Sequence, residues 1–174
     1  GRITSLLVNC KTLLVCTENS GLSIMEVCSD SFRRLLPDNR FHSRDYFSSR
    51  EVNCLFRINE GVVWVGTEVG GLNIWPSGRL VFHTPETKCK GCLGVSTGSD
   101  VRSIYVDAVG NQILVGLKNR GIALLEEEKG KWNVTGSIQP LQPGEAGRSV
   151  YVQKQVGKEL YLGTEDGIFR LKLP

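Results

Sequence analysis

The sequence predicts an all-β fold made of about four consecutive four-stranded antiparallel sheets, the last of them incomplete. The first observation behind this prediction is a short apolar repeat that ends in a polar turn and a glycine, at Gly21, Gly71, Gly121 and Gly167. These glycines lie 50, 50 and 46 residues apart. The second observation is composition, because 20 glycines and a single methionine in 174 residues indicate many turns and few long helices.

Each copy of the repeat is predicted to contribute up to four strands. The first strand is expected at residues 3–8, 52–58, 101–106 and 149–152, which are rich in β-branched and other apolar residues. The second is expected at residues 13–16, 63–65, 113–115 and 160–162, and the third follows the turn glycine. A weaker fourth strand is expected at residues 32–36, 79–83 and 131–134. The one helix-like stretch, residues 124–129, is bounded too tightly by glycines to form a helix.

Recurring small residues indicate how each copy packs. The turn glycines are expected to adopt positive φ. A second set of glycines lies within a strand, where a neighbouring sheet approaches closely: Gly66, Gly116 and Gly163. A threonine hydroxyl is expected to bond within the turn at Thr17, Thr67 and Thr164. Because these residues recur at equivalent places, they favour a structural role over a chemical one.

Antiparallel four-stranded sheets that repeat every ~40–50 residues are typical of β-propeller blades. We therefore predict a single propeller domain or propeller fragment, with units at residues 1–50, 51–100, 101–147 and 148–174. Three arrangements are compatible with this pattern: a compact four-bladed ring, an arc closed by another chain or a second copy, or part of a larger propeller. An open arc would expose apolar faces at residues 3–6 and 161–169, which favours self-association or pairing with further blades.

Residues 63–72, Val-Trp-Val-Gly-Thr-Glu-Val-Gly-Gly-Leu, resemble the repeat of two-component regulator propellers. Residues 106–116 carry the Asp-x-x-Gly-Asn turn of that repeat, at Asp107, Gly110 and Asn111. Cys16 and Leu117 depart from the pattern, where glycine and threonine are expected. The resemblance implies an extracytoplasmic sensor domain of a membrane-bound histidine kinase, and hence a periplasmic or extracellular location. Similar repeats occur in intracellular scaffold propellers of the WD40-like and citron-homology kinds.

The function that we expect is non-catalytic recognition in signal transduction, with a soluble ligand or protein partner bound through the loops between blades. The alternative is an intracellular scaffold that mediates protein–protein interaction. Candidate contact residues lie in the connector at residues 38–50: Arg40, Phe41, His42, Arg44, Tyr46 and Arg50. The connectors at residues 84–100 and 137–147 are expected to share a face with it, since rigid sheets position such loops for binding.

The six cysteines do not all have the same predicted state. Cys16 and Cys54 lie in apolar runs, where a free thiol behaves as a small buried side chain. Cys89 and Cys92 form a C-x-x-C pair that is compatible with two ordinary thiols, with a disulfide or redox-active pair, or with a zinc site that includes His83. A fourth zinc ligand is not evident, so neither a metal nor another cofactor is expected. Reduced cysteines would favour a cytoplasmic location.

Other classes of function have little support in the sequence. A net charge of +3 is too small to indicate a nucleic-acid partner. No run of 18 apolar residues occurs, so direct membrane insertion is not expected. Only two histidines are present, and neither a G-x-S-x-G elbow nor a phosphate-binding Walker loop occurs. We therefore expect no enzyme, with chemistry at the Cys89 and Cys92 loop as a weaker third hypothesis.

Overall fold

The computed structural model describes residues 1–9, 11–29, 31–35, 49–59, 61–76, 83–96, 98–107, 112–138 and 149–172. These residues form strands and turns and contain no helix, so none of them forms an apolar helix that could cross a membrane. The all-β prediction is confirmed. Residues 124–129, the helix-like stretch, lie mainly in β11, and the turn after it carries Lys129 and Gly130 at positive φ.

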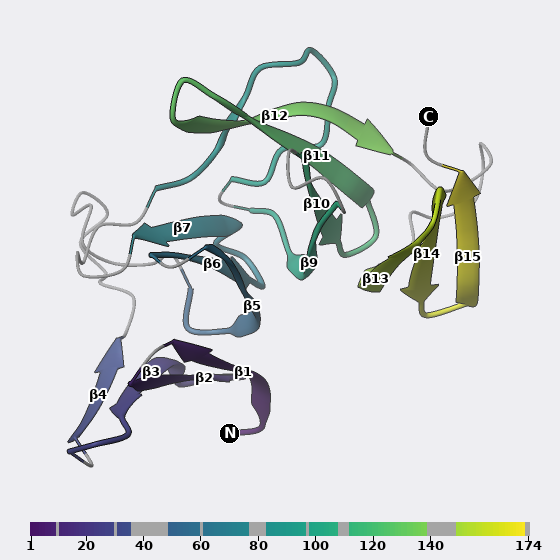
Figure 1. Cartoon of the computed structure of the whole chain (residues 1–174). Coiled ribbons are helices and arrows are strands. Elements are labelled where there is room, and N and C mark those ends of the chain that lie inside the picture. The colour runs from purple at the N-terminus through teal and green to yellow at the C-terminus, as the bar shows by residue number, and fades with distance from the viewer. Residues whose placement is uncertain are drawn as a thin grey trace.

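The described residues form four sheets that follow one another along the chain (Figure 1). The first contains β1 (Ile3–Asn9), β2 (Thr12–Thr17), β3 (Gly21–Glu26) and β4 (Ser31–Leu35). The second contains β5 (Val52–Asn59), β6 (Val62–Thr67) and β7 (Leu72–Pro76). The third contains β9 (Val101–Val106), β10 (Gln112–Leu117), β11 (Gly121–Glu128) and β12 (Lys131–Ile138). The fourth contains β13 (Val150–Val156), β14 (Glu159–Thr164) and β15 (Gly167–Lys172).

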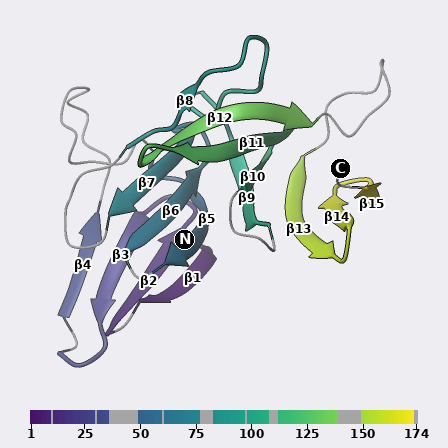
Figure 2. The ribbon, with the colours of Figure 1, turned by 45° about the horizontal axis from the view of Figure 1, so that its top comes forward.

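The sheets form an arc (Figures 1 and 2). Contacts join β1 to β5, β5 to β9, and β9 to β13, so the first strands of neighbouring sheets lie side by side along the inner edge. Apart from β8 (Glu86–Thr87), the strands of each sheet run outward in chain order and pair antiparallel. Figure 1 shows the first and fourth sheets apart, at the two ends of the arc. This is the arrangement of consecutive propeller blades.

Among the described residues, three hydrophobic cores lie between neighbouring sheets. Strand alternation sends Leu14 towards the second sheet, whereas Val63 and Val65 point back towards the first. At the next interface Trp64 packs with residues of the third sheet, and its ring meets Trp132 edge-on at a centroid distance of 5.1 Å. The fourth sheet contributes Leu160 and Leu162 to the third core, each fully buried. Each inner sheet therefore buries both of its faces.

The turn predictions are confirmed. The hydroxyls of Thr17, Thr67 and Thr164 donate to the carbonyl oxygens of the turn glycines at 3.3, 2.8 and 3.1 Å. All four turn glycines have positive φ. Gly71 also has no room for a side chain, because a Cβ would lie 2.2 Å from the carbonyl oxygen of Val95. The segment that contains Val95 and Ser96 therefore packs directly on the backbone of Gly71.

The structure differs from the prediction in the number of strands per sheet. The third sheet has a fifth strand, β8 (Glu86–Thr87), which runs parallel to β12. The fourth strand expected at residues 79–83 is represented by an isolated bridge between Ile74 and His83, and residues 79–82 lie outside the described part. Lys88 holds the segment that follows β8 against the third sheet. Its backbone N–H donates to the carbonyl oxygen of Val134 at 3.1 Å, and its Nζ lies 2.6 Å from Glu128 Oε2.

The prediction of exposed end faces is correct in part. Ile3 and Leu6 are 56% and 58% exposed. At the other end Ile168 is 79% exposed, but Tyr161 and Phe169 are only partly exposed. The prediction is wrong for Phe169, which does not lie on the open face. Phe169 packs against the core between the third and fourth sheets.

Candidate functional site

One face of the arc gathers the start of each first strand and the turn between each second and third strand. Backbone hydrogen bonds tie the turns to the segments between sheets. The N–H of Gly21 donates to Arg50 at 2.8 Å, and that of Gly71 donates to Ser99 at 3.0 Å. We call this surface the loop face and define it by residues 49–51, 53, 68–69, 98–102, 118–119 and 149.

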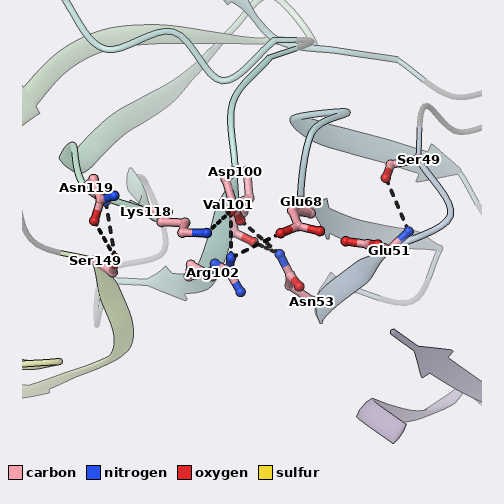
Figure 3. Close-up of polar contacts among 10 residues, drawn as sticks. All are labelled: Ser49, Glu51, Asn53, Glu68, Asp100, Val101, Arg102, Lys118, Asn119 and Ser149. Carbon is pink, nitrogen blue, oxygen red and sulfur yellow. Dashed lines mark hydrogen bonds and ion pairs between the residues drawn. The ribbon is translucent and has the colours of Figure 1, made fainter. Parts of the chain in front are cut away.

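A charged cluster spans the second and third sheets on the loop face (Figure 3). Asp100 lies at its centre and accepts a hydrogen bond from Arg102 Nη2 at 2.6 Å. The Nδ2 of Asn53 donates to the other oxygen of Asp100 at 3.1 Å and to the carbonyl of Val101 at 2.9 Å. Lys118 Nζ lies 3.7 Å from Asp100 Oδ2. Asp100 therefore holds groups from both sheets at once.

The side chains of the cluster are partly buried at its centre and more exposed at its rim. The side chains of Asp100 and Arg102 are 16% and 21% exposed, whereas those of Glu68 and Lys118 are 32% and 43% exposed. Arg102 Nη2 also lies 3.7 Å from Glu68 Oε1, so the guanidinium bridges two carboxylates. The partly buried pair of Asp100 and Arg102 orders the charges of Glu68 and Lys118, which remain accessible to a partner.

A smaller polar contact joins the third and fourth sheets on the same face. Asn119 has φ 56° in the turn after β10, and its Oδ1 accepts a hydrogen bond from Ser149 Oγ at 3.0 Å. The backbone N–H of Ser149 lies 3.4 Å from Glu165 Oε1. The loop face therefore continues from the second sheet to the fourth.

The predicted contact residues are described only in part. Arg50 is exposed and its backbone belongs to the loop face. The remaining candidates lie outside the described residues: Arg40, Phe41, His42, Arg44 and Tyr46. The sequence analysis did not predict the cluster around Asp100. The available signal was the recurrence of a carboxylate immediately before a first strand, at Glu51 and Asp100.

The metal candidates do not come together. Cys89 and Cys92 are joined by a disulfide, so their sulfur atoms are not thiolate ligands in this state. His83 forms its bridge through backbone atoms, with N–O distances of 2.7 and 2.9 Å to Ile74. Within the described ranges, no three His, Cys, Asp or Glu residues are grouped as a metal site would require.

The remaining described cysteines are free. Cys16 lies in the core between the first and second sheets, and Cys54 lies in the core between the second and third sheets. Cys16 is fully buried and Cys54 is partly buried, as their apolar surroundings predict. Burial raises the pKa of the Cys54 thiol to about 12 and that of Cys16 still further. Both groups are therefore neutral thiols at physiological pH, which is the wrong state for a nucleophile. Cys28 is exposed.

Comparison with solved structures identifies the arrangement. The chain superposes with a TM-score of 0.69 on the extracellular domain of the putative hybrid two-component system BT4673 from B. thetaiotaomicron, at 16% identity, covering 97% of this chain and 20% of that one. It matches the C-terminal WD40 domain of Sif2 with a TM-score of 0.66 at 12% identity. This match covers 100% of this chain and 46% of that one. The chain has a β-propeller fold.

A third similar structure is the computationally designed Ika4 protein, with a TM-score of 0.64 and 12% identity. This match covers 100% of this chain and 92% of that one. No protein-family model and no curated protein matches the chain. At these identities the similarity concerns the propeller fold alone. The chain spans about a fifth of the BT4673 domain and about half of the WD40 domain, at 20% and 46%.

Proposed function

We propose that this propeller is a non-catalytic recognition module whose loop face binds a protein partner. The observation that carries the proposal is the charged cluster around Asp100, which orders accessible groups of both signs where the segments between sheets meet. Alternating charges on a rigid surface favour a polar protein surface of complementary pattern, because such groups fix register and exclude wrong partners.

The mechanism that we propose is a change in the packing of neighbouring sheets. Asp100 and Asn53 connect the second and third sheets through the same contacts that order the rim. A partner that draws Lys118 or Glu68 away from the cluster would weaken this connection. Binding would thereby alter how the two blades pack, and that change would pass to whatever is joined to the domain.

The finer proposal is a sensor domain outside the cytoplasm. The Cys89–Cys92 disulfide supports it, since disulfides persist mainly in oxidising compartments. The free thiols of Cys16 and Cys54 are protected by burial and so are compatible with either compartment. An intracellular scaffold is the second candidate, and the free, exposed thiol of Cys28 favours it. Trapping of thiols in intact cells, followed by mass spectrometry of the 89–92 peptide, distinguishes the two.

The proposal is tested by placing a photoreactive amino acid at Lys118 and, as a matched control, at Lys158. Lys158 is an exposed lysine in the turn between β13 and β14, at the opposite end of the strands from the loop face. We expect a specific protein to be cross-linked from position 118 and not from position 158. The captured protein is then purified for direct binding measurements.

Binding of that purified partner to charge-reversal variants completes the test. Lys118→Glu and Arg50→Glu are expected to weaken binding about tenfold or more, the effect of disturbing charges within an interface. Lys158→Glu is expected to bind like the unaltered chain. Equal affinity for all three variants, or the same cross-linked protein from both positions, would contradict the proposal.

A further inference from the structure

Equivalent positions in the four sheets differ sharply in exposure at one end of the arc. The residue after each turn glycine is apolar in every sheet. Leu22, Leu72 and Ile122 are fully buried against the following sheet, at 0% exposure each. Ile168 occupies the same position in the fourth sheet and is 79% exposed. Val152, on the same face of β13, is 59% exposed. We call this surface the tail face, defined by Val152, Val156, Tyr161, Gly163 and Ile168.

At the other end of the arc, the first sheet exposes residues whose equivalents in the later sheets are buried against the preceding sheet. Val52, Val101 and Val150 each begin a first strand and are 0% exposed, because each packs on the preceding sheet. Ile3 is the equivalent residue of β1 and is 56% exposed. Farther along β1, Leu6 and Val8 are 58% and 61% exposed. We call this surface the head face, defined by Ile3, Leu6, Val8, Leu13 and Val15.

The internal interfaces show what each face is shaped to contact. A Cβ on Gly66 would lie 2.6 Å from Val101 of the next sheet, and one on Gly116 would lie 2.6 Å from the backbone of Val150. Each glycine thus forms a notch that receives the first residue of the following sheet. Gly163 is the equivalent glycine of the fourth sheet, and the nearest described atoms to a Cβ there all belong to Val152 of its own sheet. Ile3 is the residue that corresponds to Val101 and Val150.

We infer that a second copy of this chain docks its head face on the tail face, in the manner of the internal blade interfaces. Every copy carries both halves of the contact, so two copies related by a twofold axis form two identical contacts and close a ring. The occupant is a second copy because the two end faces repeat the two sides of an interface already present within the chain.

The contact between copies is expected to be weaker than the internal ones. The tail face is flanked by Lys154 and Arg170, where the inner sheets carry apolar residues such as Phe56 and Leu124. Arg170 is paired with Glu159 at 3.5 Å, which leaves its charge partly compensated. Because charged groups at an interface oppose association unless they are paired, the dimer should dissociate on dilution.

Light scattering of the whole chain across a dilution series, from about 200 µM to about 1 µM, tests the inference over the range of weak protein association. The expected result is a mass of twice 19.2 kDa at high concentration that falls towards 19.2 kDa on dilution. The variants Ile3→Asp and Ile168→Asp, one on each face, should each be monomeric throughout and keep the circular dichroism spectrum of the unaltered chain. Both residues are exposed in the single chain, so neither substitution should impair its folding.

Val27→Asp is the matched control, because Val27 is 56% exposed in the turn between β3 and β4, away from both end faces. It should dimerise like the unaltered chain. A monomer at every concentration would overturn the inference. So would a dimer that survives Ile168→Asp but not Ile3→Asp, since that result would indicate contact between two head faces. Lys118→Glu, which tests the loop face, should leave the mass unchanged, so the two proposals can fail separately.

Discussion

The interface between the second and third sheets and the two ends of the arc are built from the same kinds of residue, yet they differ in burial. At the interface Trp64, Ile113 and Val115 are completely buried. At the ends, the residues Ile3 and Ile168 are more than half exposed. The interface also has directed polar contacts, since Asn53 donates to the carbonyl of Val101 at 2.9 Å.

The comparison shows that the repeat determines the strand, whereas the neighbouring sheet determines the burial. An isoleucine after the turn glycine is a core residue in the third sheet and a surface residue in the fourth. Substitutions at equivalent positions should therefore have large effects inside the arc and small effects at its ends. The predictions below use monomeric protein at low concentration.

The largest difference is expected between Gly71→Ala and Gly167→Ala. Both glycines have positive φ, 73° and 121°, so both substitutions carry backbone strain. Only at Gly71 would the added methyl group also collide with backbone, 2.2 Å from the carbonyl oxygen of Val95, whereas nothing lies within 4 Å at Gly167. Chemical denaturation should show a loss of about 3 kcal/mol or more for Gly71→Ala and about 1 kcal/mol for Gly167→Ala. Equal losses would mean that the close approach of Val95 is not part of the fold.

The next effect concerns side-chain burial. Ile122→Ala removes a fully buried side chain from the core between the third and fourth sheets and should cost about 2–5 kcal/mol. Ile168→Ala removes the equivalent side chain where it is 79% exposed, and it should change the free energy of unfolding by less than about 0.5 kcal/mol. Urea denaturation of the two variants measures both values. A large loss for Ile168→Ala would show that the fourth sheet is covered within the single chain.

A smaller effect is expected from pH at the interface between the second and third sheets. Burial raises the pKa of Cys54 to about 12 from an ordinary value near 9. Above pH 9 the thiol ionises in the unfolded chain while it stays protonated in the folded one, so stability falls as pH rises from about 9 to about 12. Denaturation midpoints at pH 8, 9 and 10 should fall more steeply for the unaltered chain than for Cys54→Ala. Parallel slopes would contradict the burial of this thiol.

The repeat allowed much of the fold to be predicted. The strands, the turn glycines and the threonine hydroxyls all follow from short-range patterns, because alternation and turn chemistry act within a few residues. The three-stranded fourth sheet was also expected. In contrast, β8 was not expected, because a strand of only Glu86 and Thr87 has no periodicity and depends on docking against β12, more than 40 residues away.

The candidate site was less accessible to prediction. Glu68, Asp100 and Lys118 each resemble an ordinary solvated turn residue in the sequence. They meet because the turn after β6 and the start of β9 lie on the same end of adjacent sheets, which depends on how the sheets pack. The exposure of Phe169 was misjudged for a related reason, because the side of β15 that faces the third sheet is set by strand register.

The measurement that tests the repeated interface most directly is the difference in unfolding free energy between Gly116→Ala and Gly163→Ala. A methyl group on Gly116 would lie 2.2 Å from Ser103 Oγ and 2.6 Å from the backbone oxygen of Val150, neither of which can move freely. At Gly163 the nearest atom in the described part of the chain is Cγ1 of Val152, at 2.4 Å, and it belongs to an exposed side chain that can rotate. We predict a loss of about 2–3 kcal/mol for Gly116→Ala and less than about 1 kcal/mol for Gly163→Ala. Equal losses, or a larger loss at Gly163, would contradict the account in which a neighbouring sheet closes over one glycine and leaves the other open.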